Sequence, residues 1–165
     1  VIAGKSKYMK LMDEVFVSTT FGGFTLGLVA AIECIKMMRE YGDVHKHMHE
    51  TGEYLMKNFN CIARESNVPV ELTGYGPHPI MKVNIADDYL SRVLKTFIYQ
   101  EFNKQGILFS SSMMVGYIHK KLEIDLILNV FKNICGKLKD VVDYEELKKR
   151  IDGKVVAPRT VRNTQ

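Results

Sequence analysis

The segment Ser18-Thr19-Thr20-Phe21-Gly22-Gly23 contains the residues of this chain best suited to binding chemistry. An apolar, helix-forming run from Thr25 to Met38 follows it at once. Two glycines let the backbone approach a ligand closely, the hydroxyls add hydrogen-bond donors, and the first turn of a helix offers unpaired N–H groups and the positive end of its dipole. The pattern predicts a turn that binds a phosphate group. The alternative is that Ser18, Thr19 or Thr20 only caps the helix, which the residues favour when taken alone.

Three alternating histidines form a second candidate. On a helix, His45 and His49 share one face at the i, i+4 spacing that can bind a metal, with His47 between them in sequence. No carboxylate or cysteine pattern completes such a site. We therefore expect a solvated polar face and no metal.

The three cysteines, Cys34, Cys61 and Cys135, are widely spaced and form no Cys-x-x-Cys pair. This argues against both a disulfide framework and a zinc site, and indicates reduced thiols in the cytoplasm. Cys34 and Cys135 lie in helical apolar patterns, so we expect both to be small side chains in or near the core.

The composition limits the class of protein. The 165 residues have 46% hydrophobic content, which is enough for one sizeable core. A net charge of +4, from 23 basic and 19 acidic residues interspersed along the chain, indicates no nucleic-acid partner. Charged residues interrupt every apolar run before the roughly 20 residues that a membrane helix needs. We expect a soluble, cytoplasmic protein.

Hydrophobic periodicity predicts helices alternating with short strands. The expected helices cover residues 7–14, 25–41, 44–65, 90–104, 122–138 and 144–151, and the expected strands cover 1–4, 68–74, 80–85 and 107–110. An irregular loop, 75–79, with two prolines joins the middle strands, and residues 152–165 form a wrapped or mobile tail. The spacing of apolar residues predicts buried faces that contain Leu28, Ile32, Ile35 and Met38 in one helix and Leu122 and Leu126 in another.

The most specific motifs of the chain lie in residues 1–32: Val1-Ile2-Ala3-Gly4-Lys5, Tyr8-Met9, Ser18 to Gly23 and Ala30-Ala31-Ile32. In order and spacing these motifs resemble the later half of class III pyridoxal-phosphate-dependent aminotransferases, most of all the glutamate-1-semialdehyde 2,1-aminomutase branch. Gly106 to Ser110, Tyr117-Ile118-His119 and the helix starting near Leu122 match more loosely. The resemblance covers nearly the whole chain.

The resemblance implies an α/β fold, namely the C-terminal small domain of a fold-type I pyridoxal-phosphate-dependent transferase. Helices would pack on a small, mainly antiparallel sheet. Residues 1–23 would end the large cofactor-binding domain, residues 24–151 would form the connecting helix and the small domain, and residues 152–165 would be a tail.

The resemblance also implies an activity and a cofactor. The complete enzyme would be a homodimer that transfers an amino group between a small-molecule donor and a keto or aldehyde acceptor. The Thr20 hydroxyl and the backbone N–H of Thr19 or Thr20 would bind the phosphate of pyridoxal 5'-phosphate in the other subunit. The family's Schiff-base lysine lies upstream of the segment matching Val1, so this chain contains no catalytic residue and is expected to be an inactive fragment.

Two alternatives remain for the activity. One is the aminomutase reaction, an isomerisation, and the other is a non-catalytic interaction module. The acidic pocket residue of the aminomutases has no counterpart between Gly106 and His119, which favours transamination.

The same stretch contains Ser110-Ser111-Ser112, near where the family's C-terminal domain contributes to the substrate pocket. No nucleophile motif surrounds the serines. Met113-Met114 hints at an apolar pocket, with core packing as the alternative, and His119 is expected to bind a loop or cap a helix.

Overall fold

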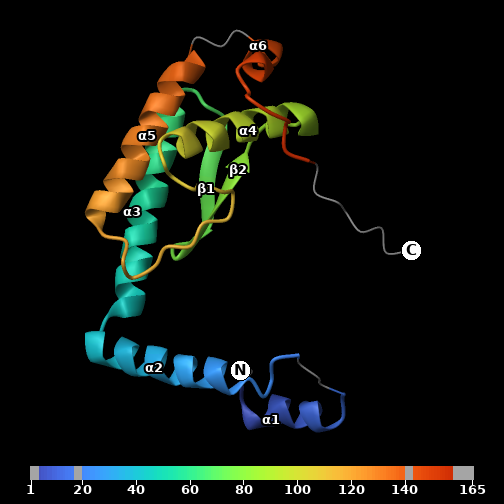
Figure 1. Cartoon of the computed structure of the whole chain (residues 1–165), viewed down its shortest axis with the longest axis vertical. Helices are drawn as coiled ribbons and strands as arrows, with labels where there is room; N and C mark the ends of the chain where they lie inside the picture. The colour runs from blue at the N-terminus through green and yellow to red at the C-terminus, as the bar shows by residue number, and fades with distance from the viewer. Residues whose placement is uncertain (1–3, 17–19, 140–142, 158–165) are drawn as a thin grey trace. The chain divides into compact units, whose positions relative to one another are not determined.

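The computed structural model describes residues 4–16, 20–139 and 143–157 of the chain. The chain divides into two compact units, Val1–Gly42 and Asp43–Gln165 (Figure 1). The division predicted for the complete enzyme, at residues 23 and 151, stays a prediction.

The first unit is helical. It contains α1 (Ser6–Met9), the 3-10 helix η1 (Lys10–Asp13) and α2 (Thr25–Tyr41), as the sequence predicted for residues 7–14 and 25–41. Residues 1–3 of the predicted first strand lie outside the described residues. The N-cap position of α2 is held by Phe24, so the alternative interpretation, in which a hydroxyl residue only caps this helix, is wrong.

The prediction that α2 has a buried face is also wrong. Its apolar side chains do share one face, but the helix has no buried residue, and Ile32 and Ile35 remain about half exposed. Cys34 is exposed for the same reason. Periodicity shows which side chains lie together, and it does not supply the layer that would cover them.

The second unit packs helices against one face of a hairpin (Figure 1). Its elements are α3 (Val44–Glu65), β1 (Val70–Tyr75), β2 (His78–Val83), α4 (Asp88–Lys104), α5 (Lys121–Lys139) and α6 (Tyr144–Lys149). Gly42, with φ of 70°, ends α2 just before α3, as its place in the sequence predicted. Leu72 and Met81 pair across the sheet and are buried, whereas the neighbouring pair Thr73 and Ile80 faces solvent.

The hairpin is tighter than the sequence predicted. Tyr75 pairs with His78 and Gly74 with Pro79, so only Gly76 and Pro77 form the turn. The irregular loop expected at 75–79 is therefore wrong. Proline is compatible with an edge position of a sheet, because it lacks only a donor.

The predicted third strand at 107–110 is also wrong, since the described sheet has two strands. Instead, residues 111–115 run beside β2 and are held by three backbone hydrogen bonds. Met81 N donates to Ser111 O (2.7 Å), Met113 N to Pro79 O (3.0 Å) and Val115 N to Pro77 O (2.9 Å). Only Ile80 and Ser112 form a β-bridge.

Stacked phenylalanines form the centre of the core. The ring centroids of Phe59 and Phe131 are 3.6 Å apart, and those of Phe102 and Phe109 are 4.1 Å apart. These rings join α3, α5, and α4 with the segment that follows it. Cys135 is buried as predicted.

The predicted apolar face of α5 was too broad. Leu122 and Leu126 are 77% and 56% exposed, because the inward face runs through Ile124, Leu128 and Phe131.

Glu101 is a charged residue inside this unit, with only 5% of its surface exposed. Burial of the carboxyl group works against ionisation, but hydrogen bonds from Lys137, Gln100 and Lys104 outweigh it and hold the pKa of Glu101 below its ordinary value. The ion pair to Lys137 connects α4 with α5, and the ion pair to Lys104 lies within α4.

The described part of the tail, up to residue 157, packs along α4. Val156 N donates to Thr96 Oγ1 (3.0 Å), and Arg92 Nη1 donates to Val156 O (3.1 Å). The wrapped form of the tail is thus confirmed for this part. Within the described ranges, no helix has the length and apolar character needed to cross a membrane.

Candidate functional site

The candidate phosphate-binding segment forms a turn at Thr20 to Gly23 that leads into α2. Phe24 N donates to Phe21 O (3.1 Å), and this hydrogen bond closes the turn. Leu28 N donates to Phe24 O (3.1 Å), which is the first hydrogen bond of the helix. Among the described residues no side chain caps the helix, and no acidic residue lies in its first turn. Its first N–H groups are therefore available to an anion that no carboxylate of that turn repels.

Thr20 is exposed, and its hydroxyl makes no hydrogen bond with any described residue. Gly23 faces open space, since a Cβ placed there would meet no atom within 4 Å. The turn thus offers a free hydroxyl and an open approach to the helix end, which fits a phosphate group. Thr19 lies outside the described residues.

Two histidines of α3 hydrogen-bond other segments, His47 a loop and His49 the end of β1. His47 Nε2 lies 2.9 Å from His119 O, and His49 Nε2 lies 2.6 Å from Tyr75 Oη. The prediction of a solvated face is correct for exposed His45 and wrong for the other two. The described residues contain no group of three side chains placed to hold a metal ion, and the absence of a physiological metal stays a prediction.

Close to the hydrogen bond between His49 and Tyr75, the backbones of α3 and the hairpin turn come into contact. A Cβ added to Gly52 of α3 would lie 1.8 Å from the carbonyl oxygen of Gly76 in the hairpin turn. Two glycines therefore let the helix touch the turn directly. Sequence analysis missed this contact, although a glycine inside a predicted helix is the usual signal of a close approach.

The serine triplet holds its own loop. Ser110 Oγ donates to Ser112 O (2.6 Å), and Ser112 Oγ lies 2.8 Å from His78 Nε2. His78 was not predicted as a partner, because it lies 34 residues away in sequence. No acidic side chain among the described residues hydrogen-bonds this histidine, so the pair lacks the third member of a nucleophilic triad.

His119 accepts a hydrogen bond at Nδ1 from Gly116 N (2.8 Å), which confirms its predicted structural role in a loop.

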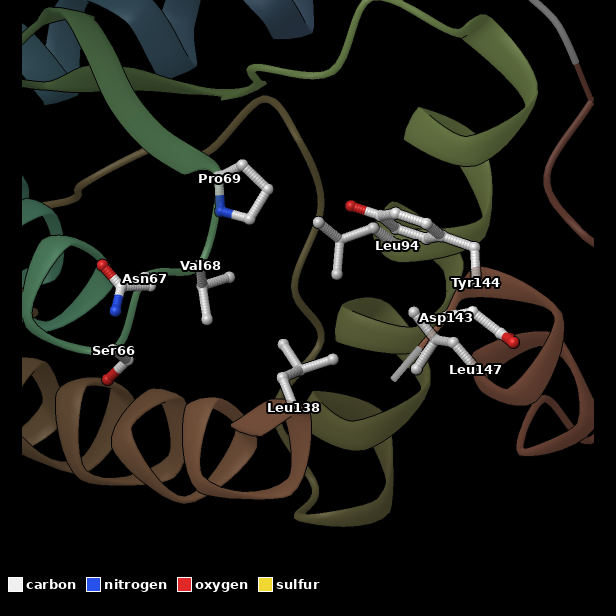
Figure 2. A pocket seen from close by; sticks show the side chains of 9 residues that line it. All are labelled: Ser66, Asn67, Val68, Pro69, Leu94, Leu138, Asp143, Tyr144 and Leu147. Carbon is white, nitrogen blue, oxygen red and sulfur yellow. The ribbon is translucent and has the colours of Figure 1, made fainter. Parts of the chain in front are cut away.

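Two of the cavities in the second unit bear on the residues discussed above. One, of about 330 Å³, is lined by Ser110, Met113, Met114 and His119 among others. The smaller, of about 160 Å³, is surrounded by Val68, Leu94, Leu138 and Leu147, with Asp143 and Tyr144 at its edge (Figure 2).

The polar groups of the smaller cavity are already engaged or buried. The Asp143 carboxylate accepts from Glu146 N (2.7 Å), and burial raises the pKa of the Tyr144 hydroxyl. Residues 140–142, which precede Asp143, lie outside the described residues, so we assign no site to this cavity.

Comparison with known proteins finds a relative in sequence and several similar structures, of which two follow. No family model matches the chain. The 3-aminobutyryl-CoA aminotransferase of Cloacimonas acidaminovorans is 29% identical over 118 residues, which cover 71% of this chain and 28% of that protein. An omega-transaminase from Sphaerobacter thermophilus matches with a TM-score of 0.54 and 15% identity over 60% of this chain and 25% of its own. The FumI protein of Sphingopyxis sp. MTA144, in its PLP internal aldimine form, matches with a TM-score of 0.65 and 16% identity over 87% of this chain and 35% of its own.

These matches define the class of fold. The helix-rich second unit with its two-stranded antiparallel sheet has the fold predicted for it, that of the C-terminal small domain of fold-type I transferases. In sequence the chain is similar to an aminotransferase, of which it spans about 28% of the length.

Proposed function

We propose that this chain forms the C-terminal part of a class III pyridoxal-phosphate-dependent aminotransferase. The observation that carries the proposal is the Thr20–Gly23 turn before an uncapped helix, in a chain 29% identical to an aminotransferase. The transaminase fold supports it independently.

In this proposal the turn binds the cofactor phosphate. The Thr20 hydroxyl donates one hydrogen bond, the backbone N–H of Thr19 or Thr20 donates another, and the N-terminal end of α2 contributes its dipole. Pyridoxal phosphate, when bound, supplies an electron sink for proton transfer at the substrate carbon. The phosphate contacts fix the position of the ring, and the Schiff-base lysine comes from a segment that precedes the match to Val1.

The cofactor belongs to a second copy of the protein, so that the turn completes the partner's site in a homodimer. The chain alone would then be inactive.

Transamination is preferred over the aminomutase reaction for a specific reason. The loop from Gly106 to His119 has no acidic residue, and no charged side chain lines the cavity beneath it. An interaction module without chemistry would need no free hydroxyl at Thr20.

The test is the affinity of the complete enzyme for pyridoxal phosphate. Thr20→Val removes the hydroxyl at nearly constant volume and should weaken binding by about 1–3 kcal/mol, or roughly 5- to 150-fold in Kd. Thr20→Ser should retain most of the affinity. Thr73→Val, at an exposed hydroxyl of β1, is the matched control and should leave the Kd unchanged.

The visible absorbance of the cofactor reports both binding and reaction with an amino donor. If Thr20→Val binds the cofactor as tightly as the unchanged protein, the phosphate assignment is refuted. If the complete enzyme binds no pyridoxal phosphate, the whole proposal fails.

A further inference from the structure

A groove of about 560 Å³ lies between β2, α4 and the described end of the tail. Three cationic side chains line it, those of Lys82, Arg92 and Lys95, together with one carboxylate, that of Asp88. Its volume falls within the range of small-molecule sites, about 300–1,000 Å³. An excess of positive charge in a recess of the surface favours an anionic ligand.

Lys95 is the cation of this groove that is free to bind. Its side chain is partly buried, and it makes no hydrogen bond or ion pair with any described residue. Ser91 and Tyr99 lie one turn before and one turn after it on the same face of α4. An ammonium group that is held partly away from water without a counter-charge is stabilised when an anion binds beside it.

Three hydroxyl groups add hydrogen-bond donors to this cation. The side chains of Ser91, Tyr99 and Ser111 line the groove, and none of their hydroxyls bonds to a described residue. They come from α4 and from the segment beside β2, so they reach the groove from two sides. A phosphate group, with three acceptor oxygens and a charge of about −1.5 to −2 near pH 7, can use several such donors at once.

The one carboxylate of the lining does not cancel the positive charge. Asp88 is 76% exposed on its side chain and is already paired with Arg92, whose Nε lies 2.9 Å from Oδ2. Arg92 also donates from Nη1 to Val156 O (3.1 Å), which fixes the guanidinium and leaves Nη2 without a bond to the described residues. Lys82 is ion-paired with Glu71 at 3.3 Å, so Lys95 is the cation whose charge is not yet compensated.

We propose that this groove binds the phosphate group of a small organic phosphate. Lys95 supplies the counter-charge, and the three hydroxyls donate hydrogen bonds to the phosphate oxygens. Ile80, Val83 and Val156 line the rest of the groove, and this apolar wall favours an organic phosphate over the free ion. The second unit forms the groove by itself, so the inference does not depend on the proposed function.

The test is a titration of the whole chain followed by ¹H–¹⁵N NMR. The probes are glycerol 3-phosphate, inorganic phosphate and succinate, a dicarboxylate of similar charge. The amide signals of Ser91, Lys95 and Ser111 should shift with a saturating curve. Glycerol 3-phosphate should bind most tightly, and succinate about tenfold more weakly, because each of its carboxylates offers only two oxygens to the donors.

Variants separate this groove from other sites on the chain. Lys95→Gln should weaken the binding of glycerol 3-phosphate about tenfold or more, and Lys95→Arg should restore most of it. Lys57→Gln is the matched control, because Lys57 is an exposed lysine of α3 outside the lining that also has no partner among the described residues. It should leave the Kd unchanged, as should Thr20→Val, and urea unfolding shows that each variant is folded.

The site is overturned if Lys95→Gln binds as tightly as Lys57→Gln, or if the signals that shift are confined to residues 20–28. Inorganic phosphate or succinate binding as tightly as glycerol 3-phosphate would overturn the assignment of an organic phosphate. Failure of the groove to bind any probe leaves the Thr20 assignment standing. Loss of pyridoxal phosphate binding by the complete enzyme, with unaltered binding in the groove, would refute only the proposed function.

Discussion

Gly52→Ala tests the closest backbone contact in the second unit. The added methyl group would lie 1.8 Å from the oxygen and 2.3 Å from the carbonyl carbon of Gly76. Both neighbours are backbone atoms, so a side-chain rotation cannot relieve the overlap. The helix and the hairpin turn must separate by more than 1 Å to reach the ordinary contact distance of about 3.5 Å.

The magnitude follows from three contributions. Overpacking costs about 1–3 kcal/mol, and separation of the turn from α3 weakens the His49–Tyr75 hydrogen bond, at about 0.5–1.5 kcal/mol. Alanine in place of glycine within a helix stabilises the folded state by about 0.5–1 kcal/mol, which offsets part of this loss. The net expectation is a loss of about 0.5–4 kcal/mol in the free energy of unfolding.

The control is the same substitution where space is free. Gly136 lies within α5, is exposed, and has no atom within 4 Å of an added Cβ. Gly136→Ala should therefore raise the free energy of unfolding by about 0.5–1 kcal/mol.

The assay is urea unfolding followed by circular dichroism, with NMR of the Tyr75 and His49 rings as a local readout. The two variants should shift the midpoint in opposite directions. A Gly52→Ala protein as stable as the unchanged chain, with unaltered ring signals, would refute the direct contact between helix and turn.

Three further predictions concern charge, thiols and exposed surface. Because the folded state lowers the pKa of Glu101, this carboxylate stabilises the fold above its ordinary pKa of about 4.3, and the contribution is lost as pH falls through the lower folded value. Glu101→Gln should thus cost about 1–3 kcal/mol at pH 7 and progressively less in acid, measured by urea unfolding across pH; a constant difference would contradict this. Ellman's reagent should modify exposed Cys34 first. Cys61 should react more slowly, because the hydrogen-bonded carboxylate of Glu65 raises the pKa of its thiol. Cys135 should react only on unfolding, since it is buried and burial raises its pKa to about 11. Ile35, 51% exposed on the uncovered face of α2, should promote self-association, so Ile35→Gln should lower light scattering of the isolated chain, and an unchanged signal would oppose this.

Local pattern accounts for the helices. The ends of α2 and α3 follow from Gly42 and from apolar spacing, and α4 ends at Gln105-Gly106, where Gly106 takes a positive φ. These features depend on residues within a few positions of one another, so they can be predicted from the chain alone. The Thr20–Gly23 turn was predicted from its composition for the same reason, and the alternative that its hydroxyl residues only cap the helix is wrong.

Contacts between distant segments could not be predicted in this way. Three features join residues more than 20 positions apart. They are the hydrogen bond between His78 and Ser112, the close contact of Gly52 with Gly76, and the irregular segment that lies beside β2 in place of a third strand. Whether a face is buried also depends on which element covers it, as the exposed side chains of α2 and the buried ones of α5 show.

The amino-acid sequence by itself determined the helices, the hydroxyl and glycine turn, and the resemblance to aminotransferases, because each is written in neighbouring residues. Only the tertiary structure decided which histidines hold loops, which apolar faces are covered and where an uncharged cavity forms, because burial and packing are set by segments that meet only after folding.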